Sequence, residues 1–223
     1  MQQSFWQERW STDRIGFHEA AANELLRKFG DRLENKAGEG CLLVPLCGKS
    51  NDLTHLARAG FTVHGVEFVE QAVRAFFLEN DMLFQEFPDG CFQGLAPASA
   101  ERITLWRRDF FRMRRDELPL VTAIYDRAAL IALPADTRKR YAEHITTLAV
   151  PGALQLLVAL DYDQNEMSGP PHAVTPAEVD ELYSADWSIE PLESRDSLAL
   201  NPHFAERGLS RLEETVYLLR RKS

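Results

Sequence analysis

The sequence predicts an α/β protein with a doubly wound, mostly parallel seven-stranded sheet. Two observations predict it. Short apolar runs typical of buried strands alternate with segments whose apolar residues recur at helical spacing. Such alternation is typical of a parallel sheet covered by helices, and right-handed crossovers wind it in two directions. The chain has 223 residues, 45% of them hydrophobic, and no linker divides it, so we expect a single domain over residues 1–223.

The first 125 residues supply four of the predicted strands, at residues 42–46, 61–66, 103–106 and 121–125. Between the first two, Leu53, Leu56 and Ala57 recur at helical spacing, and Gly60 is expected to end that helix as a C-cap. A second helical stripe covers residues 69–77, and a loop is expected around residues 88–100.

The second half supplies one helix, then a strand, another helix and two last strands. A helix is predicted from Pro134 to about Leu148, and Pro151–Gly152 then turn the chain into a strand at residues 154–160. Residues 175–178 form a capping box with proline at the first helical position, so a helix begins there. The two last strands are predicted at residues 187–192 and 215–219.

The stretch LVPLCGKS, residues 43–50, resembles half of a phosphate-binding loop. Such a loop needs a glycine five positions before Gly48, where this chain has Leu43, and Pro45 lacks an amide hydrogen. The dinucleotide pattern G-x-G-x-x-G is also absent. Two readings stay open, a plain strand-to-helix turn and a different ligand site, because ligands of doubly wound sheets bind where strands end.

Acidic residues follow the next two predicted strands. Glu67 lies 19 positions after Gly48, close to the spacing at which an acid accepts hydrogen bonds from ribose hydroxyls. Asp109 is placed to accept from an adenine amino group, and Phe110 could cover the ring. Singly, each could be a solvated acid or a core phenylalanine. Together they indicate a nucleoside cofactor without a diphosphate.

Composition excludes several classes of partner. The net charge of −9 and the pI near 5.2 argue against nucleic acid, and acids interrupt the basic run of residues 107–115. No apolar stretch is long enough to span a membrane, and the polar, aromatic N-terminus does not resemble a signal peptide. Three cysteines without metal-ligand spacing favour a reduced, cytoplasmic protein. The six histidines also lack metal-ligand spacing.

Longer motifs carry a family resemblance over nearly the whole chain. The chain resembles the bacterial branch of the thiopurine S-methyltransferase family, which is part of the class I S-adenosylmethionine-dependent methyltransferases. The matching stretches are FWQERW (5–10), GFHEA (16–20), VPLCGKS (44–50), VHGVE (63–67), DFF (109–111), YDRAALIALP (125–134), LDYDQ (160–164), GPP (169–171) and LEETVYLLRR (212–221).

The resemblance implies a Rossmann-like fold with an antiparallel last strand and a helical N-terminal cap over residues 1–40. It implies S-adenosylmethionine as cofactor, S-adenosylhomocysteine as product and no metal. Cofactor contacts are expected at Trp10, Leu46, Glu67, Asp109, Phe110 and Arg127. Acceptor contacts are expected at Phe17 and Arg127. No residue is assigned as catalytic.

Some of these residues have a second interpretation. Trp6 and Trp10 lie four apart, so in a helix they share a face that could attract a sulfonium or simply fasten the N-terminus. Arg127 could instead form a salt bridge with Asp126 or with a neighbouring acid. Arg138 is predicted to be a surface charge.

The implied activity is methyl transfer to the sulfur of thiopurines or related aromatic and heterocyclic thiols, with selenium or tellurium compounds as physiological alternatives. A small-molecule thiol or selenol is therefore the expected partner, and a monomer is the expected state. The chain departs from the family at His172, and His203 or Arg207 could replace a missing basic position; these changes put the acceptor in doubt. The alternative function is a non-catalytic module that binds S-adenosylmethionine or another adenosine ligand.

Overall fold

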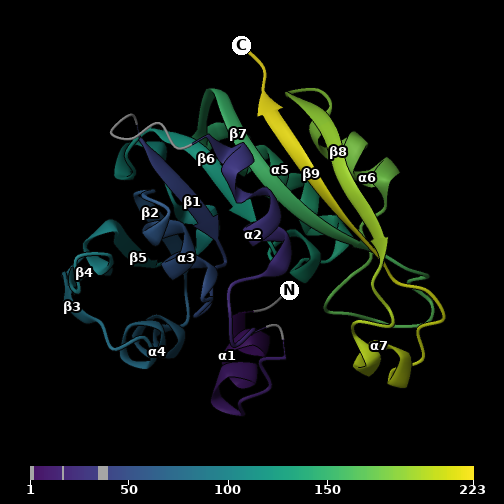
Figure 1. Ribbon diagram of the computed structural model, residues 1–223, viewed down its shortest axis with the longest axis horizontal. Helices are drawn as coiled ribbons and strands as arrows, with labels where there is room; N and C mark the ends of the chain where they lie inside the picture. Colours follow the sequence, from purple (N-terminus) through teal and green to yellow (C-terminus); the bar gives the residue numbers. More distant parts are fainter. Residues whose placement is uncertain (1–2, 17, 35–39) are drawn as a thin grey trace. The chain divides into compact units, whose positions relative to one another are not determined.

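The computed structural model describes residues 3–16, 18–34 and 40–223 (Figure 1). The chain forms two compact units, Met1–Tyr125 and Asp126–Ser223. The single domain over residues 1–223 therefore stays a prediction. Among the described helices, none has the length and apolarity needed to cross a membrane.

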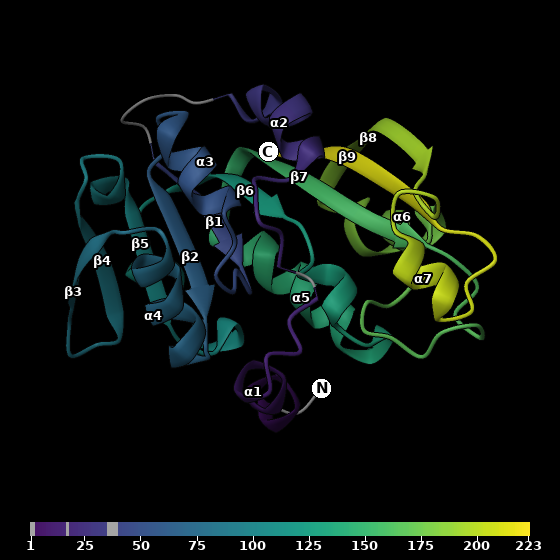
Figure 2. The same cartoon turned by 60° about the horizontal axis from the view of Figure 1, so that its bottom comes forward.

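The first unit contains a sheet with strand order β3-β4-β5-β2-β1-β6. Its parallel part consists of β1 (Cys41–Pro45), β2 (Val63–Glu67), β5 (Ile103–Arg107) and β6 (Val121–Asp126). Figure 2 shows β1, β2 and β5 side by side. Every residue of β1 and β2 is buried, as expected for central parallel strands covered on both faces.

The sheet edge differs from the prediction. Strand β4 (Cys91–Ala96) lies in the loop expected around residues 88–100, and it forms an antiparallel hairpin with β3 (Leu83–Glu86), where no element was predicted. The described residues therefore contain nine strands where seven were predicted. Strand β3 is mostly exposed, so its sequence lacks the apolar run that indicates a buried strand. Gly94 in β4 lets the backbone approach closely, because an added Cβ would lie 2.1 Å from the Ala100 carbonyl oxygen.

Helices of the first unit follow the predicted pattern. The N-terminal segment forms α1 (Gln3–Ser11), α2 (Glu24–Phe29) and the 3-10 turn η1 (Gly30–Leu33), in agreement with a helical cap. After β1 comes α3 (Asp52–Arg58), and Gly60, with φ +95°, follows its end as predicted. After β2, α4 (Glu70–Glu79) buries Ala72, Val73, Phe76 and Phe77.

The second unit is built on three antiparallel strands in the order β7-β9-β8. They are β7 (Ala149–Asp161), β8 (Trp187–Asp196) and β9 (Glu213–Arg221), and α5 (Ala135–Leu148), α6 (Pro176–Tyr183) and α7 (Pro202–Glu206) accompany them (Figure 1). The last strand is antiparallel, as expected. Strand β7 begins five residues earlier than predicted and runs through Pro151 and Gly152. Thr175 caps α6 by accepting from the Glu178 N–H at 3.2 Å.

Candidate functional site

The turn after β1 is strained and packs directly on β2. Leu46 adopts φ 47°, a left-handed conformation that is uncommon for residues other than glycine, and Gly48 follows with φ 52°. The Cys47 side chain lies over Gly65 of β2, where an added Cβ would be 2.7 Å from its sulfur. Glycine is therefore required at position 65 for this turn to lie where it does.

Glu67, the last residue of β2, fastens this turn. Its carboxylate accepts from the Gly48 N–H at 3.1 Å and from the Val69 N–H at 2.7 Å. The side chain is buried, and burial raises its pKa to about 7 against the lowering effect of the backbone donors. The Phe68 N–H is a further backbone donor to this carboxylate, so an ionised Glu67, with about four lone-pair sites, keeps one for a ligand.

The contact of Lys49 argues against a phosphate-binding loop. Its ammonium group donates to both carboxylate oxygens of Glu79, at the end of α4, at 2.7 Å each. The lysine is therefore engaged by an acid, whereas the lysine of a phosphate-binding loop reaches a phosphate. This agrees with the absence of the first glycine of that motif.

Asp109 and Phe110 follow β5. Asp109 caps the 3-10 turn η3 (Phe110–Arg112), and its Oδ1 accepts from the Phe111 N–H at 3.0 Å. The Arg108 N–H donates to the Glu67 carbonyl at 3.0 Å, which holds the ends of β5 and β2 together. The Phe110 side chain is buried in the core. Packing of Phe110 against an adenine ring stays a prediction.

A hollow of about 430 Å³ lies beside Asp109. It is lined by residues 68–70 after β2, by residues 107–109 after β5, and by Gln3 and Gln7 of α1. The Gln3 side-chain amide donates to Asp109 Oδ2 at 3.3 Å. An amide N–H at this oxygen shows that the carboxylate can accept from an amino-type donor within the hollow. No sequence signal pointed to Gln3 or Gln7.

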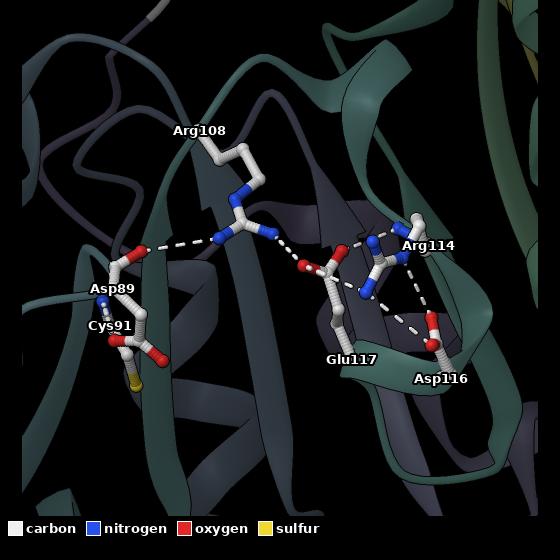
Figure 3. Close-up of polar contacts among 6 residues, drawn as sticks. All are labelled: Asp89, Cys91, Arg108, Arg114, Asp116 and Glu117. Carbon is white, nitrogen blue, oxygen red and sulfur yellow. Dashed lines mark hydrogen bonds and ion pairs between the residues drawn. The ribbon is translucent and has the colours of Figure 1, made fainter.

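Three arginines of the basic run next to this hollow, Arg107, Arg108 and Arg114, form ion pairs with acids. Figure 3 shows Arg108 between Glu117, with which it forms an ion pair, and the Asp89 carbonyl, to which it donates at 3.2 Å. Arg114 donates to Asp116 at 3.0 Å, and its backbone N–H donates to Glu117 at 2.8 Å. These pairs fit a solvated loop face better than a nucleic-acid surface.

Trp10 anchors α1. Its indole is buried against Val69 and Ala72, with Phe68 packed beside it. The Gln71 side chain donates to the Trp10 carbonyl at 3.3 Å. This packing supports the fastening role of Trp10, and attraction of a sulfonium by its ring stays a prediction.

In the second unit, Arg127 directly follows β6 and is partly exposed. The preceding Asp126 is fully buried, and its carboxylate accepts from Leu130 N–H, Tyr141 hydroxyl and Gln155 amide donors. Phe17, the other predicted acceptor contact, lies outside the described residues. Arg127 therefore carries the acceptor prediction alone in the described part of the chain.

The prediction of a surface position for Arg138 is wrong. Arg138 is 4% exposed; it pairs with Glu178 at 2.8 Å and donates to the Ala173 carbonyl at 2.8 Å. It lines a hollow of about 520 Å³ together with His172, whose pKa is lowered by burial and by Arg138. The single-sequence pattern missed it because a helix face cannot be assigned to solvent before its neighbours are known.

The other candidates are more exposed. His203 lies on α7 with its ring centroid 4.1 Å from that of Phe204, and Arg207 follows α7; both are exposed. Across the described ranges, no group of three His, Cys, Asp or Glu side chains could hold a metal ion.

Solved structures show the same fold. The chain aligns with the crystal structure of Burkholderia thailandensis 1,6-didemethyltoxoflavin-N1-methyltransferase with bound S-adenosylhomocysteine at a TM-score of 0.62 and 16% identity, covering 99% of this chain and 87% of that one. It aligns with the glycopeptide N-methyltransferase MtfA complexed with S-adenosylhomocysteine at 0.61 and 15%, covering 92% and 91%. The predicted Rossmann-like methyltransferase fold is confirmed.

Sequence comparison is more specific. Proteins named thiopurine S-methyltransferase are 49% identical in Pseudomonas paraeruginosa, over 99% of this chain and 100% of the relative, and 46% identical in Azotobacter vinelandii, over 100% of both. The family model described as "Thiopurine S-methyltransferase (TPMT)" matches residues 1–222. Because the family model and these relatives match over nearly the full length of the chain, the chain belongs to the thiopurine S-methyltransferase family.

Proposed function

We propose that this chain transfers a methyl group from S-adenosylmethionine to the sulfur of thiopurines or related aromatic and heterocyclic thiols. One observation carries the proposal: the family match spans residues 1–222, so it includes the Pro45–Gly48 turn and the Glu67 carboxylate fastened to it. A selenol or tellurium acceptor would use the same chemistry, because a soft, easily ionised nucleophile is all that the reaction requires.

The first unit fits the nucleoside part of the cofactor. The buried Glu67 carboxylate, after its backbone donors, would accept from a ribose hydroxyl. Asp109 presents a carboxylate oxygen to a hollow of about 430 Å³, where an adenine amino group would donate to it. Leu46, in its strained turn, would contact the cofactor from the end of β1. Bound S-adenosylmethionine supplies an electrophilic methyl group on a positively charged sulfur.

The second unit contributes Arg127. Heterocyclic thiols are substantially ionised near neutral pH, so the acceptor needs little help from a general base. A guanidinium at this position would bind the anionic acceptor by a charge-assisted hydrogen bond and orient its sulfur for in-line attack. The protein's contribution is then proximity and orientation, which can supply a large share of the rate enhancement.

A transfer assay tests the proposal. Purified protein is incubated with S-adenosylmethionine labelled on its methyl group and with 6-mercaptopurine, and labelled S-methyl product is expected. Calorimetry with S-adenosylhomocysteine is run in parallel. Binding without transfer to 6-mercaptopurine, other aromatic thiols or selenols would favour the alternative, a non-catalytic adenosine-binding module. Absence of both heat and product would contradict the two functions together.

A cytoplasmic, monomeric protein completes the proposal. All three cysteines are free thiols, which supports a reducing compartment. Light scattering after size-exclusion chromatography is expected to give one chain of 25.4 kDa. A mass of two or more chains would contradict the monomer.

A further inference from the structure

A buried carboxylate that the proposed chemistry does not use lies beside Arg127. Asp126 is the last residue of β6 and is 0% exposed. Its Oδ1 accepts from the Leu130 N–H at 3.1 Å, and its Oδ2 accepts from the Tyr141 hydroxyl at 2.8 Å and the Gln155 amide at 3.3 Å. Burial raises the pKa of Asp126 to about 6, while the Leu130 and Tyr141 donors lower it.

The donors are themselves fixed. Tyr141 lies on α5 and Gln155 on β7, and both side chains are fully buried. A buried polar network whose members come from separate elements allows its central group very little freedom. The network therefore fixes the position of the Asp126 carboxylate. The Leu130 N–H, which donates to the same carboxylate, is fixed with it.

That bond closes the turn that contains Arg127. The Asp126 carboxylate and the Leu130 N–H are the two ends of a five-residue segment. Within it, Ala128 adopts φ 62°, a left-handed conformation that a non-glycine residue keeps only where its surroundings impose it. The segment continues into the 3-10 turn η5 (Leu130–Ala132), where the Ile131 carbonyl accepts from the His172 N–H at 2.6 Å. Both ends of the turn are thus fastened.

We infer that Asp126 is a positioning residue for Arg127: held by Tyr141 and Gln155, it closes the Asp126–Leu130 turn and so fixes the backbone from which the guanidinium extends. This rests on the proposed function, in which Arg127 binds the acceptor and contacts the cofactor. A carboxylate kept for stability alone would not need this location, since well-packed apolar side chains often replace buried charges without loss of stability.

A double-mutant cycle separates positioning from plain stabilisation. Asp126→Asn keeps one oxygen for the Leu130 N–H and places an amide opposite the Tyr141 and Gln155 donors. Tyr141→Phe is the milder variant and removes one donor only, so it decides the test if Asp126→Asn does not fold. Each is made in the wild-type background and in an Arg127→Ala background. The readouts are kcat and KM for 6-mercaptopurine, and Kd for S-adenosylhomocysteine by calorimetry.

In the wild-type background we expect both variants to lower kcat/KM by about tenfold, because small misplacement of an orienting group is costly. In the Arg127→Ala background we expect less than about a twofold further loss, because residues that act as one unit are not additive. Val179→Ala, which shortens a buried α6 side chain, is the control: it is expected to lower Tm and leave the kinetics unchanged.

Other results overturn the inference. Equal losses in both backgrounds would mean that Asp126 acts independently of Arg127. Wild-type kinetics in both variants, while Arg127→Ala is impaired, would mean that the turn is held without the network. If the wild type transfers no methyl group, the proposed function fails, and the cycle is then read from Kd alone; additive changes in Kd would overturn the positioning role as well.

Discussion

At the scale of single residues, Glu67 joins two tasks at the end of β2. It fastens the Pro45–Gly48 turn through the Gly48 N–H and keeps acceptor capacity for a ligand. Glu67→Gln is expected to weaken S-adenosylhomocysteine binding at least tenfold, because hydrogen bonds to charged groups contribute roughly 1.5–3 kcal/mol. The measurement is calorimetry at pH 8, with Glu101→Gln, at an exposed acid in η2 (Ala100–Arg102), as control. Equal affinity of all three proteins would remove Glu67 from the site.

The same residue predicts a pH dependence of affinity. Burial raises the Glu67 pKa to about 7, so its carboxylate is protonated below that pH and ionised above it. The ionised form is the better acceptor for a ribose hydroxyl, so wild-type affinity is expected to rise as pH increases from 6 to 8. Glu67→Gln has no proton to lose and should lack this rise. A rise of equal size in both proteins would assign it to another group.

Arg127 gives a kinetic prediction. Arg127→Glu replaces the proposed partner of the anionic acceptor with a like charge, so kcat/KM for 6-mercaptopurine is expected to fall by about 10- to 100-fold while the fold persists. Lys139→Glu makes the same charge reversal at an exposed position on α5 and serves as the matched control. Steady-state kinetics that do not distinguish Arg127→Glu from the control would rule out the acceptor role.

At the scale of elements, Trp10 is the buried side chain that attaches α1. Trp10 packs against Val69 and Ala72, at the start of α4. Trp10→Ala should lower the free energy of unfolding by about 3 kcal/mol, the lower end for loss of a buried tryptophan. Hydrogen exchange is expected to show α1 amides losing protection while β1 and β2 keep theirs. Trp6→Ala, at a half-buried position, should cost less; a larger cost for Trp6 would reverse the assignment of the anchor.

The elements also show what the sequence could predict. Apolar runs predicted the parallel strands β1, β2, β5 and β6, because both faces of a central parallel strand are covered. The hairpin β3–β4 was missed because an exposed edge strand has no such run. Glu67 and Asp109 were predicted as site residues from their spacing along successive strands, and their roles stay predictions. Gln3, which donates to Asp109, is far from it in sequence and carries no local signal. Arg138 was misplaced because its burial depends on Glu178 and Ala173, which follow much later in the chain.

At the scale of the whole molecule, His64 is expected to make folding stability decrease as the solution is acidified. This residue is buried in β2, accepts from the Trp106 indole N–H at 3.1 Å, and has its pKa lowered to about 4 by burial. Its lowered pKa means that the unfolded chain binds the proton more readily, so stability from this group is lost as pH falls from about 6.5 to 4. The loss is about 3 kcal/mol at its full extent.

The measurement must separate His64 from two buried acids. Burial raises the pKa values of Glu67 and Asp126, so their contributions to folding stability are lost as pH rises. This trend is opposite in sign to that of His64. Urea unfolding of the wild type and of His64→Gln between pH 4 and 7 isolates the difference between them. The wild type should lose its advantage over the variant as the solution is acidified; a pH-independent difference would exclude His64 as the source.

The shielded cysteines have a consequence for a protein that handles reactive sulfur compounds. Burial raises the pKa of Cys41 to about 12, that of Cys47 well above its ordinary value, and that of Cys91 to about 11. Only a thiolate attacks a disulfide, so at neutral pH none of the three is prepared to exchange with oxidised forms of a substrate. We therefore expect the protein to bind mercaptans, or encounter their disulfide dimers, without forming mixed disulfides. The Cys47 sulfur is also shielded sterically, because it is buried against Gly65 of β2.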